Sequence, residues 1–156
     1  MITQFGQQGI QDSRTGSGNR LVIKDTTISH NASTGIGLGG AAVTGTTIDN
    51  VRSFDNLFGI GAVNGNNVSI RRSVFSNNSN AGIEADPGAQ INVNDTTISG
   101  NGTGVQASGT IRLSNSDISF NSTAITGSGA QTYGNNRISG NGAVGSAPTA
   151  ASPGQQ

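Results

Sequence analysis

The chain has 156 residues, which is enough for one domain. It carries 8 basic and 8 acidic residues and a formal net charge of zero, so no bulk attraction to nucleic acid or to an anionic membrane surface is expected. It has no cysteine, which excludes disulfides, thiolate metal sites and a cysteine nucleophile, and it has no apolar run near the roughly 20 residues of a membrane span.

The first segment already has the pattern of a repeat unit. "ITQFGQQGI" at 2–10 aligns with "ISHNASTGI" at 28–36, but no strand-like stretch precedes Ile2. Solenoids usually need a cap over the first coil. We therefore expect the chain to be the C-terminal part of a longer protein with a signal peptide, secreted or displayed at the cell surface. An uncapped edge also predicts self-association through exposed coil ends.

An isoleucine-centred unit then recurs along the chain. Its anchor positions are Ile2, Ile28, Ser53, Phe75, Ile98, Ile118 and Ile138, in steps of 20 to 26 residues. Repeats of this period are typical of solenoids, in which each unit forms one coil. A composition rich in glycine, serine and asparagine would by itself favour disorder, but the regular period favours an ordered stack of coils.

Apolar residues before each anchor are spaced by two, as in a β-strand with one buried side. Five residues before the anchors lie Ile23, Ile48, Ile70, Val93, Leu113 and Tyr133, and seven before lie Leu21, Thr46, Val68, Ile91, Ile111 and Gln131. No segment has a helical period. The sequence thus predicts an all-β fold, a right-handed parallel β-helix of about six coils of 20–26 residues that spans residues 1–142.

An asparagine follows each anchor by three residues from the second coil onward. These residues are Asn31, Asn56, Asn78, Asn101, Asn121 and Asn141. Asparagine tolerates the left-handed backbone of a sharp turn, and stacked amides can hydrogen-bond from coil to coil. We interpret the column as a structural asparagine ladder at one corner of the coil. A row of asparagine ligands for a sugar is the alternative.

Charged residues cluster in two columns that should point outward. The first, four residues before the anchors, is Lys24, Asp49, Arg71, Asn94, Ser114 and Gly134, and the next is Asp25, Asn50, Arg72, Asp95, Asn115 and Asn135. Neighbours in a column lie one strand spacing apart. Lys24, Asp25, Asp49, Arg71, Arg72 and Asp95 therefore form a candidate ligand-binding surface. A solvated ladder of alternating charge, of little energetic weight per pair, is the competing interpretation.

Other motifs give weaker signals. Glu84 and Asp86 are two residues apart, but calcium needs six to eight oxygen ligands, so a turn is the preferred interpretation. His30 is the only histidine and is expected at a solvated corner. We therefore expect no metal, no cofactor and no catalytic residue set.

The repeats resemble the right-handed parallel β-helix of the pectate-lyase-like superfamily. The last unit, "YGNNRISGN" at 133–141, is similar to coils of secreted or surface bacterial β-helix proteins of unassigned function. The resemblance implies the fold and a possible polysaccharide partner, although one fold hosts many activities. The calcium-binding aspartates, paired carboxylates and Asp-Pro-His motif of its enzymes are not found.

Two functions follow as hypotheses. The first is a non-catalytic structural or carbohydrate-interacting module of a secreted or cell-surface bacterial protein. The second is a lyase-like or hydrolase-like fragment acting on an acidic glycan, in which Lys24, Arg71 and Arg72 would neutralise a uronate carboxylate and Lys24 or an arginine would remove a proton. Residues 143–156, with two of the three prolines, are expected to form a flexible tail.

Overall fold

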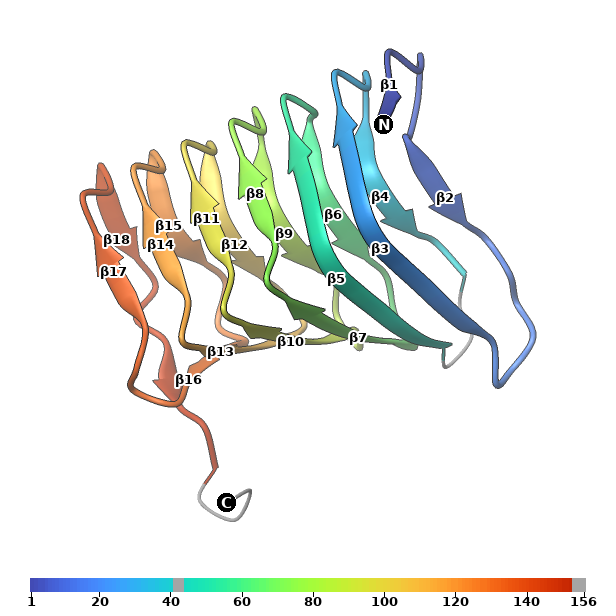
Figure 1. The fold of residues 1–156 in the computed structure, drawn as a ribbon. Helices are drawn as coiled ribbons and strands as arrows, with labels where there is room; N and C mark the ends of the chain where they lie inside the picture. The colour runs from blue at the N-terminus through green and yellow to red at the C-terminus, as the bar shows by residue number, and fades with distance from the viewer. Residues whose placement is uncertain (41–43, 153–156) are drawn as a thin grey trace.

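The computed structural model describes residues 1–40 and 44–152. Figure 1 shows short strands stacked coil upon coil, from the N-terminal coil in blue to the last coil in red. In the described part of the chain all strand pairs are parallel, and no helix is long and apolar enough to cross a membrane. The predicted all-β, right-handed parallel solenoid is confirmed, with about seven turns where about six were predicted.

Each coil has three faces. The first face contains the N-terminal parts of β3 (Arg20–Ser29) and β5 (Thr44–Phe54), followed by β7 (Asn66–Arg71), β10 (Gln90–Asn94), β13 (Thr110–Ser114), β16 (Ala130–Thr132) and β19 (Thr149–Ala150). The second contains β1 (Ile2–Thr3), the C-terminal parts of β3 and β5, β8 (Val74–Ser76), β11 (Thr97–Ser99), β14 (Asp117–Ser119) and β17 (Arg137–Ser139). The third is a separate sheet of β2 (Ile10–Asp12), β4 (Thr34–Leu38), β6 (Phe58–Ala62), β9 (Ala81–Ala85), β12 (Thr103–Ala107), β15 (Thr123–Thr126) and β18 (Ala143–Gly145).

The predicted anchors form one continuous inward column. Strand pairing aligns all seven of them, from Ile2 with Ile28 to Ile118 with Ile138. Ser53 and Phe75 break the run of isoleucines, and both side chains are fully buried. The small Ser53 leaves room for the ring of Phe75 on the next coil, and its hydroxyl donates to the Gly59 carbonyl at 2.8 Å. The pair keeps the core filled without leaving a polar group unpaired.

The asparagine ladder is present. At each of five steps, from Asn31 to Asn141, the backbone N–H and the side-chain Nδ2 of one asparagine donate to Oδ1 of the asparagine on the next coil. The donor–acceptor distances from Asn78 to Asn101 are 2.9 and 3.0 Å. These amides are buried from Asn31 to Asn121. The ladder therefore supplies the hydrogen bonds that the corner backbone would otherwise lack.

The left-handed residue at this corner lies one position before each ladder asparagine. Positive φ angles occur at His30 (56°), Asp55 (54°), Asn77 (54°) and Phe120 (58°), and Gly100 takes the same place with 69°. The expectation that the ladder asparagines themselves adopt the left-handed geometry is wrong. The tight turn comes from the preceding residue, and the asparagine follows it with its amide turned into the stack.

The last coil departs from the predicted register. Leu113 pairs with Thr132, so Tyr133 follows Ser114 in the outward column instead of Leu113 in the inward one. Gln131 likewise pairs with Arg112, which is outward. The assignments of Tyr133 and Gln131 to inward columns and of Gly134 to the outward column are therefore wrong. The physical reason is one extra residue between this strand and the next anchor, Ile138, which shifts the strand by one position.

Strand pairing continues past residue 142, the expected end of the helix. β18 pairs with β15, and β19 pairs with β16. Ala143–Gly145 and Thr149–Ala150 thus extend the third and first faces over the last coil. Residues 153–156 of the expected tail lie outside the described part of the chain.

Candidate functional site

The structure brings five of the six candidate site residues together at one edge of the first face. Lys24, Asp49 and Arg71 align on consecutive coils of its outward column, as predicted. Asp25 and Arg72 lie at the adjoining corner. The Lys24 ammonium is 3.9 Å from Asp25, whose carboxylate also accepts from Asn50 Nδ2 at 2.7 Å. The sixth residue, Asp95, is exposed at the same corner one coil beyond Arg72.

Asp49 is the centre of this group. Its side chain is only 4% exposed, yet Arg71 Nη2 donates to it at 3.2 Å and Arg72 Nη2 contacts both carboxylate oxygens at 2.6 Å. Burial alone would raise the pKa of Asp49, but the hydrogen bond from Arg71 and the charges of Arg71, Arg72 and Lys24 outweigh it and lower the pKa. The carboxylate therefore stays ionised and holds two half-exposed guanidinium groups in fixed positions.

The second predicted column lies at a corner of the coil, which falls inside the long strands β3 and β5 on two coils and just after the first-face strand on the later ones. Asp25, Asn50, Arg72, Asp95 and Asn115 all have φ between 47° and 53°. Asparagine and aspartate tolerate this left-handed backbone, which explains four of the five residues. Arg72 is the exception, and its long side chain reaches back one coil to Asp49. The same corner has a hydroxyl ladder, in which Ser73, Thr96 and Ser116 accept hydrogen bonds from backbone N–H groups of the preceding coil.

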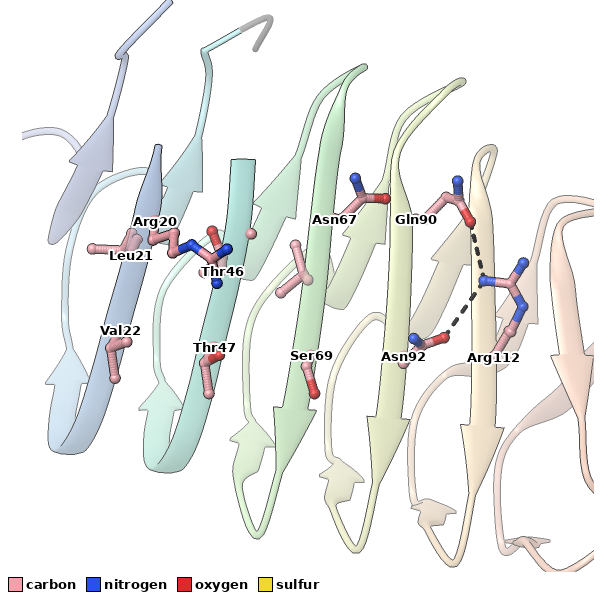
Figure 2. A pocket seen from close by; sticks show the side chains of 12 residues that line it. Arg20, Leu21, Val22, Thr46, Thr47, Asn67, Ser69, Gln90, Asn92 and Arg112 are labelled. Carbon is pink, nitrogen blue, oxygen red and sulfur yellow. Dashed lines mark hydrogen bonds between the residues drawn. The ribbon is translucent and has the colours of Figure 1, made fainter. Parts of the chain in front are cut away.

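Two adjoining hollows follow the first face across the coils. One, of about 330 Å³, extends from Arg20 and Val22 on β3 to Arg112 on β13 (Figure 2). The second, also about 330 Å³, lies between Arg71, Arg112 and Tyr133. They share Ser69, Asn92 and Arg112. Together they form one groove along the solenoid axis, which we call the first-face groove.

Amide and hydroxyl groups line the groove between its arginines. Arg112 Nη1 donates to Gln90 Oε1 at 3.2 Å and to Asn92 Oδ1 at 3.5 Å, as Figure 2 shows. Thr47 and Ser69, outward residues on neighbouring coils, add hydroxyl groups to the lining. Guanidinium, amide and hydroxyl groups of this kind suit a polar, anionic ligand.

Sequence reasoning missed Arg20, Arg112 and Tyr133. Arg20 on β3 and Arg112 on β13 also point outward. They stand in two other outward columns of the first face, beside the column of Lys24, Asp49 and Arg71. The alternation of two that marked the inward columns also points to these positions, so the signal was present for both arginines. Tyr133 gave no such signal, because only the register of the folded coil shows that its 46% exposed side chain faces the groove.

The weaker candidates lie elsewhere. Glu84 is on the third face, and burial together with the nearby charge of Asp86 raises its pKa. Its carboxylate accepts from Gln106 Nε2 at 3.0 Å. His30 is at the ladder corner, 3.5 Å from Asp55. Within residues 1–40 and 44–152, no three histidine, aspartate or glutamate side chains are grouped closely enough to hold a metal ion.

Comparison with known proteins supports the fold. A crystal structure of pectate lyase Pel9A superimposes with a TM-score of 0.60 at 17% sequence identity, over 97% of this chain and 50% of that one. The chain thus spans half the length of that protein, and identity at this level shows a shared fold alone. Comparison with curated protein sequences gives no significant match. The sequence profile of the family described as "Right handed beta helix region" matches residues 8–153. The chain therefore belongs to the right-handed β-helix family.

Proposed function

We propose that the chain is a non-catalytic, carbohydrate-interacting module of a secreted or cell-surface protein, and that its first-face groove binds an acidic polysaccharide. The observation that carries the proposal is the groove itself. Arg20, Arg71 and Arg112 line a hollow that runs over five coils, and amide and hydroxyl groups fill the space between them. An extended, anionic, hydroxylated polymer matches both the length and the chemistry of this surface.

The ion pairs favour binding over chemistry. Arg71 and Arg72 are already hydrogen-bonded to Asp49, and an arginine remains a cation in proteins, so these residues can neutralise a ligand but not remove its proton. Asp49 is itself committed to two guanidinium groups. Arg71, Arg72 and Asp49 therefore supply fixed charges that orient an anionic ligand, and none of the three is placed to react with it.

A lyase-like enzyme is the second candidate, and the fold shared with pectate lyase Pel9A favours it. In this alternative Lys24 is the remaining candidate base beside Arg71 and Arg72. Eliminative cleavage of a uronate polymer forms an unsaturated product that absorbs ultraviolet light. Incubating the protein with uronate polymers and following that absorbance distinguishes cleavage from binding. We expect binding without product.

The test of the proposal is a binding titration with oligosaccharides of uronic acids and with neutral oligosaccharides of the same length. The Arg71→Ala/Arg112→Ala variant should bind the acidic ligands about tenfold more weakly or worse, because two charge-assisted contacts are removed. The control is Arg52→Ala/Arg137→Ala, which removes the same charge from the second face. Equal loss in both variants, or no binding of any acidic glycan by the native chain, contradicts the proposal.

A further inference from the structure

The dipeptide Asn-Gly occurs three times in the chain, beginning at Asn64, Asn101 and Asn141. In this dipeptide the backbone nitrogen after the asparagine can reach the side-chain amide carbon, because glycine has no side chain to obstruct the approach. Whether the two groups react depends on how firmly the fold holds the amide and that nitrogen. The structure holds the three copies very differently.

Asn101 and Asn141 belong to the asparagine ladder, which fixes both reacting groups. The Oδ1 of Asn101 accepts from the backbone N–H and the Nδ2 of Asn78, and the backbone nitrogen of Gly102 donates to the Asn78 carbonyl at 3.1 Å. The Oδ1 of Asn141 accepts the same two bonds from the ladder asparagine one coil back, and the nitrogen after Asn141 donates to the carbonyl of that residue at 2.9 Å. Both amides can react only after the stack opens locally.

Asn64 instead lies in an exposed turn between β6 and β7. The backbone N–H of Asn66 donates to the Val63 carbonyl at 3.3 Å and closes the turn, in which Gly65 has a φ of 84°. The Gly65 nitrogen makes only a long hydrogen bond of 3.4 Å to the Gly88 carbonyl. Among the residues that the structure describes, no hydrogen bond holds the Asn64 side chain. Its amide is therefore able to turn toward the Gly65 nitrogen without breaking a bond of its own.

We propose that Asn64 is a site of spontaneous deamidation, whereas the ladder protects Asn101 and Asn141 from the same reaction. The Gly65 nitrogen loses its proton and bonds to Cγ of Asn64, and the Cγ–Nδ2 bond breaks to release ammonia. Water then opens the resulting cyclic imide at one of its two carbonyl carbons. Attack at Cγ restores the main chain and gives aspartate, and attack at the main-chain carbonyl carbon gives isoaspartate.

The product changes the turn beside the groove. Both products add a negative charge between β6 and β7, and Asn67 just beyond the turn lines the first-face groove. Isoaspartate also carries the main chain through its side-chain carbon, which lengthens a turn whose span sets the register of the strands on either side. The reaction therefore alters charge and chain length next to the groove as the protein ages.

The experiment is peptide mapping by mass spectrometry after storage of the native chain in warm, mildly alkaline buffer. Trypsin places the three dipeptides in separate peptides, because Arg71 and Arg112 lie between them. We expect Asn64 to be converted faster than Asn141 and about tenfold faster than Asn101, since the ladder residues must first be released from the stack. In concentrated urea the three rates should become similar. Equal rates in the native chain, or an unchanged Asn64 while the unfolded chain reacts, overturn the inference.

A pair of variants identifies the reacting residue. Asn64→Gln should abolish labelling of the stored protein by an isoaspartate-specific methyltransferase, because glutamine must close a larger and less favourable ring. Asn67→Gln is the matched control, since Asn67 is also exposed but is followed by Val68, and it should leave the labelling unchanged. Circular dichroism confirms that both variants are folded. Labelling that persists in Asn64→Gln, or that is lost equally in both variants, contradicts the assignment.

Discussion

At the scale of single residues, the structure depends on polar side chains that satisfy backbone groups at sharp corners. Asn78 illustrates this. Its Oδ1 accepts from the backbone N–H and the Nδ2 of Asn56, while its own N–H and Nδ2 donate to Asn101. The side chain is fully buried. Replacing it by alanine leaves the backbone N–H and Nδ2 of Asn56 without this acceptor and takes one donor from Asn101 Oδ1, in a place that water does not reach.

Asn78→Ala is therefore expected to lower the free energy of unfolding by about 2–4 kcal/mol. Urea denaturation followed by circular dichroism measures the change. Asn80→Ala, on an exposed residue of the same turn, is the matched control and should change stability little. If both variants unfold at the same urea concentration as the native chain, the ladder does not stabilise the fold as described.

The lowered pKa of Asp49 predicts that the stability of the fold depends on pH. Its pKa is lowered in the folded protein, so its ion pairs stabilise the fold above the pKa of an unfolded aspartate, about 3.9, and this contribution is lost as the pH falls through the lower folded value. Asp49→Asn should be less stable than the native chain at neutral pH, and the difference should disappear in strong acid. Asp95→Asn, exposed at the adjoining corner, is the control. A difference that is independent of pH rules out the ion pairs as its source.

At the scale of strands, the third face depends on a column of small residues against the ladder. Gly82 is one of them, and a Cβ built there would lie 2.8 Å from Ile98 Cγ2, 2.9 Å from Asn101 Nδ2 and 2.9 Å from the Gly104 carbonyl oxygen. The backbone of β9 can approach the ladder this closely only because the side chain is missing.

Gly82→Ala should accordingly lower the free energy of unfolding by about 1–3 kcal/mol through overpacking. Gly45→Ala is the matched control, because a Cβ at Gly45 meets no atom within 4 Å. We expect the control to be neutral or slightly stabilising. Thermal unfolding of the two variants side by side measures the contrast, and an equal effect of both would show that the close approach at Gly82 does not matter.

Strand identity and register were predictable from the sequence because the buried columns are aliphatic and regular. Ile48, Ile70 and Val93 align as expected. The side of the strand was predicted wrongly for Tyr133, because an aromatic residue fits either side. The sequence pattern therefore could not show the one extra residue that shifts this strand. The corner geometry of Arg72 was equally hidden, because arginine has no preference for left-handed backbone.

At the scale of the whole molecule, the solenoid separates its polar surfaces by face. The first face carries Arg20, Lys24, Arg71 and Arg112, and the third face carries Asp12 and Glu84 but no basic residue in its strands. The net charge of zero therefore conceals an uneven distribution. Composition alone excluded bulk attraction to polyanions, whereas the fold gathers four cations and one anion, Asp49, on the face for which binding is proposed.

The positions of the candidate site residues were predictable, but their partners were not. Asp49 and Arg71 were expected as neighbours in a column, and they are. That Arg72 also reaches Asp49 depends on side-chain geometry between coils, which no spacing in the sequence encodes. Self-association through the coil ends and a secreted or cell-surface location remain predictions.

The most direct test of the central claim is a nuclear magnetic resonance titration of the isotope-labelled chain with an acidic oligosaccharide. Binding in the first-face groove predicts that backbone amide signals of Ser69, Asn92 and Arg112 shift together and saturate. Signals of Gly61 and Glu84 on the third face should remain in place. Shifts confined to the third face, or the absence of any saturable shift, would contradict the assignment of the first-face groove as the binding surface.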